Sequence, residues 1–190
     1  MTTLAPPKKI LTVEDNAIVS ADVRSILEGA GYDVCPEAYD GVQAVEHVRA
    51  YAPDLILLDL RLPLLDGVET ASRIREESDA PILVLTGSND PELLGRAEAA
   101  GTTGHVLKPF SESGLLSAVK SRLAEHESND FHLRCIVDSM VRDGADEKSI
   151  VRALERLHTS HTTRTQARPS LRQQLRRLAR FVPRRQPAAE

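Results

Sequence analysis

Short apolar runs alternate with longer amphipathic segments over residues 8–124. Continuous apolar runs of this length are typical of strands buried on both faces of a parallel sheet. Five such runs can be recognised, at residues 10–13, 33–35, 55–58, 82–85 and 105–107. A segment with helical spacing of apolar residues follows each run. The alternation predicts an α/β fold with a doubly wound five-stranded parallel sheet and right-handed crossovers.

Polar residues and glycines suggest where the helices begin and end. The predicted N-caps are Asp66, Asp90 and Ser111. Pro91 suits a first helical position, and Gly101 suits the end of the helix that follows it.

The last third of the chain has a different pattern. Helical spacing continues on both sides of Gly144, which predicts a small helical extension, a hairpin over residues 126–158. Residues 159–190 form a Thr-rich linker and then a basic amphipathic tail, with a disordered end as the alternative. The predicted organisation is therefore an α/β domain over 8–125, the hairpin over 126–158 and the tail segment over 159–190.

Charge separates the two ends of the chain. The net charge of −4 combines a net −9 over residues 1–125 with a net +7 over residues 164–190. An acidic body joined to a basic tail predicts either an intramolecular contact or an anionic partner, and a membrane surface is one such partner.

Composition excludes several classes of protein. No run of 18 apolar residues is present, so no transmembrane segment is expected. The first residues lack the apolar core of a signal peptide, and two cysteines make a disulfide scaffold improbable. We therefore expect a cytoplasmic protein whose core is aliphatic, since aromatic residues make up only 3% of the chain.

Candidate chemistry lies directly after the apolar runs. Glu14 and Asp15 follow the first run, Asp59 the third, Thr86 the fourth and Lys108 the fifth. The carboxyl ends of parallel strands share one edge of the sheet, so these side chains should converge. Clustered carboxylates are hard oxygen ligands that suit Mg²⁺, and Mg²⁺ recruits phosphate oxygens. The pattern indicates phosphoryl transfer onto a carboxylate.

Four motifs carry a resemblance to a known family. They are ILTVEDN at 10–16, LILLDLRLPLLDG at 55–67, ILVLTGS at 82–88 and HVLKPF at 105–110. With these motifs, residues 8–125 resemble the receiver domain of bacterial two-component response regulators.

The resemblance implies a role for each site residue. Asp59 would be the phosphoacceptor. Asp15 and Asp59 would coordinate Mg²⁺ directly, together with the Arg61 backbone carbonyl, and Glu14 would act mainly through water. Lys108 would pair with the phosphoryl group.

The resemblance also implies a conformational switch. Thr86 would swing to bond a phosphoryl oxygen, and an aromatic residue three positions before Lys108 would rotate. Here that position is His105, which predicts either a weaker switch or pH-dependent signalling. The Lys108–Pro109 peptide bond is expected to be cis, as in the family.

The function implied is that of a response regulator that takes a phosphoryl group from a sensor histidine kinase and later hydrolyses it. Such a phosphoacceptor is not an enzyme in the usual sense. Its output would be a changed protein–protein contact, either a homodimer or a downstream partner. Two alternatives are a DNA-binding transcriptional regulator that uses a hairpin over 130–158, and a phosphate shuttle in a relay.

Overall fold

The structure is a computed structural model that describes residues 6–146 and 148–153. Strands and helices alternate along the described chain. The strands are β1 (Lys9–Val13), β2 (Asp33–Val34), β3 (Leu55–Asp59), β4 (Ile82–Thr86) and β5 (Gly104–Leu107). The helices are α1 (Ala17–Gly29), α2 (Gly41–Tyr51), α3 (Gly67–Glu77), α4 (Pro91–Ala99) and α5 (Glu112–Arg142).

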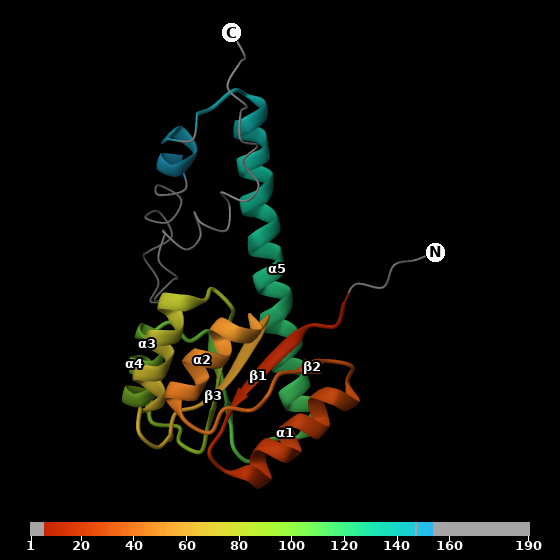
Figure 1. Ribbon diagram of the computed structural model, residues 1–190, viewed down its shortest axis with the longest axis vertical. Coiled ribbons are helices and arrows are strands. Elements are labelled where there is room, and N and C mark those ends of the chain that lie inside the picture. The colour runs from red at the N-terminus through yellow and green to blue at the C-terminus, as the bar shows by residue number, and fades with distance from the viewer. Residues whose placement is uncertain (1–5, 147, 154–190) are drawn as a thin grey trace.

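The strands form one parallel sheet in the order β2-β1-β3-β4-β5 (Figure 1). This confirms the predicted doubly wound α/β fold. The order reverses at β1, and β1 and β3 are direct neighbours. Their carboxyl ends therefore meet at the point where such sheets bind ligands.

Alternate residues of each central strand point to opposite faces of the sheet. Leu11 and Ile56 join a core with the apolar sides of α2 and α3. Ile10 and Leu57 join a second core with α1 and α5. All four side chains are fully buried, which is why the sequence shows continuous apolar runs at these strands.

Several helices begin as the sequence predicts. The side chains of Asp66, Asp90 and Ser111 accept backbone N–H bonds in the first turns of α3, α4 and α5. Asn16 and Asp40 cap α1 and α2 in the same way, although the sequence did not single them out. Each cap satisfies N–H groups that have no partner within the helix.

α5 is longer than the sequence analysis expects. It continues without a break from Glu112 to Arg142, across the boundary placed at residue 125, so the first arm of the expected hairpin is the second half of α5. Residues 115–143 contain neither glycine nor proline, and therefore no residue breaks the helix there. The 31 residues make a rod about 46 Å long that extends past the sheet (Figure 1).

The chain turns at Gly144, whose φ is 80°, and residues 148–153 are helical again. Asp146 accepts a hydrogen bond from the backbone of Ser149 at this second start. Ile150 packs on Val137, and both are buried. The rest of the predicted hairpin and the whole of residues 159–190 lie outside the described residues. No described helix is both long and apolar enough to cross a bilayer.

Candidate functional site

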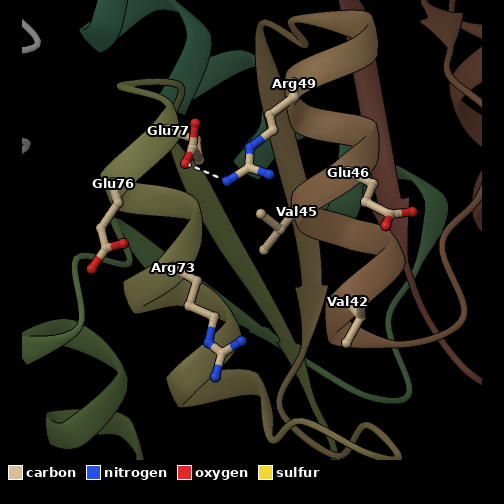
Figure 2. Close-up of a pocket in the computed structure, with 7 residues that line it drawn as sticks. All are labelled: Val42, Val45, Glu46, Arg49, Arg73, Glu76 and Glu77. Carbon is tan, nitrogen blue, oxygen red and sulfur yellow. Dashed lines mark hydrogen bonds and ion pairs between the residues drawn. The ribbon is translucent and has the colours of Figure 1, made fainter.

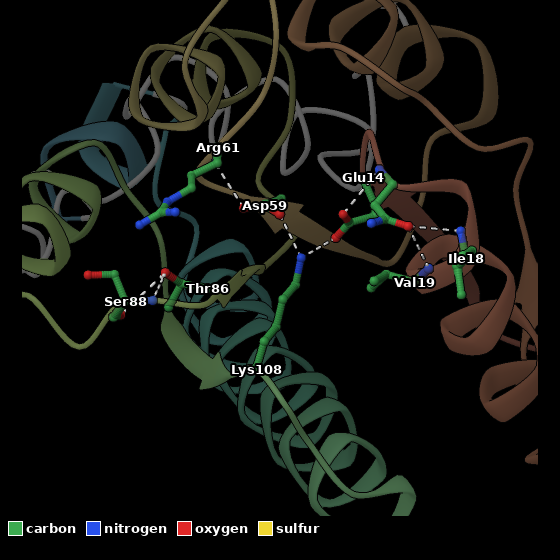
Figure 3. A network of polar contacts seen from close by, with 9 residues as sticks. Glu14, Ile18, Val19, Asp59, Arg61, Thr86, Ser88 and Lys108 are labelled. Atoms are coloured by element: carbon green, nitrogen blue, oxygen red, sulfur yellow. Dashed lines mark hydrogen bonds and ion pairs between the residues drawn. The ribbon is translucent and has the colours of Figure 1, made fainter.

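Polar side chains from four strand ends gather at the carboxyl edge of the sheet (Figure 3). Asp59 is the last residue of β3, and Glu14 and Asp15 follow β1. Lys108 follows β5 and reaches across the edge toward them. The structure therefore brings Glu14, Asp15, Asp59 and Lys108 together.

Lys108 links two of the carboxylates. Its Nζ lies 2.6 Å from Asp59 Oδ2 and also donates to Glu14 Oε2. Burial lowers the pKa of Lys108, but the hydrogen bonds to Asp59 and Glu14 outweigh burial, and the pKa stands above its ordinary value. The side chain is therefore a fixed ammonium between two acids.

Glu14 is the most deeply buried carboxylate of the group. Only 1% of the residue is exposed, and this burial raises the pKa of Glu14 more than the bond from Lys108 lowers it. The Asn16 backbone N–H also donates to Glu14 Oε1 at 3.3 Å. Asn16 thus caps α1 and steadies Glu14 at once, a double role that the sequence analysis missed. An asparagine directly before a helical segment was the available signal.

Asp59 is held at its other oxygen by the loop that follows β3. The Arg61 backbone N–H donates to Asp59 Oδ1 at 2.8 Å. α3 packs tightly beneath this loop because Gly67 has no side chain: a Cβ there would lie 2.5 Å from the Asp59 carbonyl oxygen. The residue is 7% exposed, so the carboxylate is held in a fixed orientation and little of it faces solvent.

Thr86 ends β4 and is almost fully buried. Its hydroxyl donates to the Ser88 carbonyl at 3.3 Å and accepts from the Ser88 N–H at 3.1 Å. Thr86 is therefore engaged with its own loop. His105 lies on β5 with its side chain exposed, and the Lys108–Pro109 peptide bond is cis.

The three carboxylates fit a hard divalent cation. One oxygen from each of Glu14, Asp15 and Asp59 lies within 4.8 Å of the others. Like charges this close repel unless a cation joins them, and Lys108 supplies only one positive charge. An all-oxygen donor set of this kind suits Mg²⁺ rather than zinc or copper.

A concave region lies between α2 and α3 (Figure 2). Val45 lies in it, and an ion pair between Arg49 and Glu77, 2.6 Å apart, joins the two helices. None of the residues predicted for the site lines this region. The region is lined by charged and valine side chains of the two helices, and its ion pair joins those helices.

Known proteins resemble this chain over the same region. Residues 10–120 match the family described as the response regulator receiver domain. The transcriptional regulatory protein PdtaR of Mycobacterium tuberculosis is 39% identical over 116 residues, which are 61% of this chain and 57% of that protein. The chemotaxis protein CheY of Halobacterium salinarum is 34% identical over 117 residues, 61% of this chain and 97% of CheY. The match to PdtaR thus spans just over half of its length.

Solved structures agree with this. One is the receiver domain of the sensor histidine kinase PA1611 from Pseudomonas aeruginosa, determined with a magnesium ion coordinated in its active-site cleft. It is 30% identical, with a TM-score of 0.58, over 62% of this chain and 98% of that one. The chemotaxis protein CheY4 of Vibrio cholerae is 32% identical, with a TM-score of 0.58, over 60% of this chain and 98% of that one.

Proposed function

Because the chain belongs to the response regulator receiver domain family, we propose that Asp59 accepts a phosphoryl group from a phosphohistidine of a sensor histidine kinase. The observation that carries this proposal is the arrangement around Asp59. Its carboxylate is oriented by Arg61 and Lys108 beside the carboxylates of Glu14 and Asp15. Phosphoryl transfer depends mainly on this kind of positioning and charge neutralisation.

In the transfer, an Asp59 carboxylate oxygen attacks phosphorus and forms a new P–O bond. The bond between phosphorus and the imidazole nitrogen of the donor breaks, and the nitrogen keeps the electron pair. Hydrolysis then replaces the Asp59 oxygen by a water oxygen, which releases inorganic phosphate and restores the carboxylate. In both steps Lys108 balances the charge of the phosphoryl oxygens from a position already beside Asp59.

Mg²⁺ is the cofactor that the three carboxylates fit. Asp15 and Asp59 would hold it directly with the Arg61 backbone carbonyl, and Glu14 would act mainly through water. When bound, the ion neutralises negative charge on the carboxylates and on the incoming phosphoryl oxygens. Glu14 is almost fully buried, and its Oε1 accepts from the Asn16 N–H, which supports its indirect role.

The phosphorylated state would be read through Thr86 and His105. A phosphoryl group adds about −1.5 to −2 charges at neutral pH, which attracts hydroxyl and ammonium donors. The Thr86 hydroxyl would leave Ser88 and bond a phosphoryl oxygen, and the exposed ring of His105 on β5 would rotate. The result would be a changed contact with a second copy or with a downstream protein.

The described residues do not favour the DNA-binding alternative. The first arm of the hairpin is the end of α5, and its Val137 packs on Ile150. The described part of residues 126–153 carries five Asp and Glu against four Lys and Arg. A DNA-binding face would be basic, because contacts with phosphates supply much of the affinity.

The first test is the phosphorylation site itself. Asp59→Asn should abolish labelling by acetyl phosphate and Mg²⁺, measured by intact-protein mass spectrometry, because the amide is a poor nucleophile. Asp54→Asn is the matched control: Asp54 lies just before β3 and pairs with Lys8 at 3.4 Å, outside the site. It should be labelled normally. Full labelling of Asp59→Asn would remove Asp59 from the proposal.

A further inference from the structure

The loop between β3 and α3 holds one leucine in an unfavourable backbone conformation. Leu64 has a φ of 67°, in the left-handed region that L-residues avoid. The Leu65 N–H donates to the Pro63 carbonyl at 2.8 Å, which closes a γ-turn with Leu64 at its centre. With a positive φ this is the classic form of the turn, which is rare and strained.

The Leu64 side chain gains no burial in return. It is 87% exposed, more than any other large hydrophobic side chain in the described part of the chain. Its neighbours behave differently, since Leu65 is buried and Leu62 packs against the core. Glycine or asparagine would suit this φ better, and a polar residue would suit the exposure better. Neither the backbone nor the core of this chain explains a leucine at position 64.

The rest of the loop is firmly anchored, so Leu64 is presented in a defined place. The Gly67 N–H donates to the Leu60 carbonyl at 3.1 Å. The Thr70 hydroxyl donates to the Asp66 carbonyl at 2.8 Å. The same loop begins at Asp59, five residues before Leu64, where Arg61 orients the carboxylate.

We propose that Leu64 is a specificity-determining contact for the protein that donates the phosphoryl group. This inference rests on the proposed function. A phosphohistidine on a folded donor can reach Asp59, which is 7% exposed, only if the donor surface covers the surrounding loops. The exposed Leu64 side chain would then be buried against an aliphatic patch of the donor, and burial of this apolar surface favours the complex. A small phosphodonor makes no such contact.

The decisive variant is Leu64→Gly, because glycine removes the side chain and relieves the strain. The probe is the histidine kinase that labels the wild-type chain fastest in a panel of purified, autophosphorylated kinases. The kcat/KM for transfer from that kinase should fall by about tenfold to a hundredfold. This factor corresponds to losing the free energy gained by burying one leucine side chain. Labelling by acetyl phosphate should keep its wild-type rate, and the Tm should stay equal or rise.

Two further variants complete the experiment. Leu64→Met keeps an aliphatic side chain of similar size and should keep most of the transfer rate. Phe131→Ala removes another exposed hydrophobic side chain, on the far part of α5, and should leave transfer unchanged.

Three results would overturn the inference. The first is wild-type transfer from the kinase to Leu64→Gly. The second is an equal loss of kinase and acetyl phosphate labelling, which would mean that the variant disturbs the site itself. The third is an altered association state by light scattering with unchanged transfer, which would assign Leu64 to a contact between two copies. A failure of the proposed function would give a different result, because the Asp59→Asn variant would then still be labelled by acetyl phosphate.

Discussion

At the scale of single residues, Lys108 and Thr86 differ in whether they already contact Asp59. Lys108 is already bonded to Asp59, whereas the Thr86 hydroxyl is bonded to Ser88 in the loop after β4. For Thr86 to reach a phosphoryl oxygen, the bond with the Ser88 N–H must break. The protection of that amide against hydrogen exchange therefore reports on the switch.

We predict that phosphorylation of the wild-type chain speeds exchange of the Ser88 amide about tenfold, the effect of losing one hydrogen bond of ordinary strength. In Thr86→Ala that amide should exchange fast at the start and should not change on phosphorylation. Labelling of Asp59 by acetyl phosphate should be retained, and any phosphorylation-dependent change in association should be lost. Amide exchange measured by NMR and light scattering test this.

Thr86→Ser is the control for this prediction because it keeps the hydroxyl. It should restore the protection of Ser88 and its response to phosphorylation. If Thr86→Ala still couples phosphorylation to a change in association, Thr86 has no part in the switch.

At the scale of the elements, ion pairs join helices and strands at the surface. Arg24 on α1 donates to Glu37, in the segment after β2, at 2.7 Å. The hydrogen bond from Arg24 lowers the pKa of Glu37 despite partial burial of the carboxylate. The lowered pKa means that folding favours the ionised form of Glu37. Its contribution to stability is present above the unfolded pKa, about 4.3, and is lost as the pH falls through the lower folded value.

Glu37→Gln should therefore lower the free energy of unfolding by about 1 kcal/mol near neutral pH, a value between those of exposed and buried charged hydrogen bonds. The difference from wild type should shrink at acidic pH, as the pH falls through the lowered pKa of Glu37 and the wild-type carboxylate takes up a proton. Urea unfolding at the two pH values measures both quantities.

Glu28→Gln is the matched control, because Glu28 also pairs with Arg24, at 3.0 Å, but has a 54% exposed side chain. Its effect should be smaller at both pH values. A cost of Glu37→Gln that does not depend on pH would show that packing, and not the charge, matters there.

The elements also show how far the sequence predicts the fold and the site. The five strand regions, the caps at Asp66 and Asp90, and the convergence of Glu14, Asp15, Asp59 and Lys108 follow from local patterns together with the geometry of parallel sheets. The full length of α5 was not predicted, although residues 115–143 lack glycine and proline, because the resemblance to the family ends near residue 125 and the boundary was placed there. The positive φ of Leu64 could not be predicted, since leucine disfavours it and only the anchored loop imposes it.

At the scale of the whole molecule, the opposite charges of the body and the tail remain the main feature outside the site. Residues 164–190 lie outside the described residues, so the prediction for them rests on their charge of +7 against −9 for residues 1–125. Single exposed ion pairs contribute at most about 1 kcal/mol, so only several acting together would hold the tail to an acidic partner. Such attraction weakens as the Debye length falls from about 10 Å at 0.1 M salt to about 3 Å at 1 M.

Deleting residues 164–190 should leave labelling of Asp59 unchanged, because no residue of the site lies there. It should change self-association or binding to anionic vesicles at low salt, and the difference should disappear at high salt. Light scattering and liposome flotation of the intact and truncated proteins measure these effects. If the two proteins behave alike at every salt concentration, the tail has no electrostatic role in either contact.

The unbroken course of α5 also has a mechanical consequence. Leu123 is the last residue that α5 buries in the sheet core. From there the helix continues for about 28 Å to Arg142 without a break. A rigid rod fixed at one end acts as a lever, so a tilt of about 10° at the base would carry its tip about 5 Å sideways at that length. The turn at Gly144 and the packed pair Val137–Ile150 would travel with it. A displacement too small to notice beside Asp59 would then be large at the far end of the molecule.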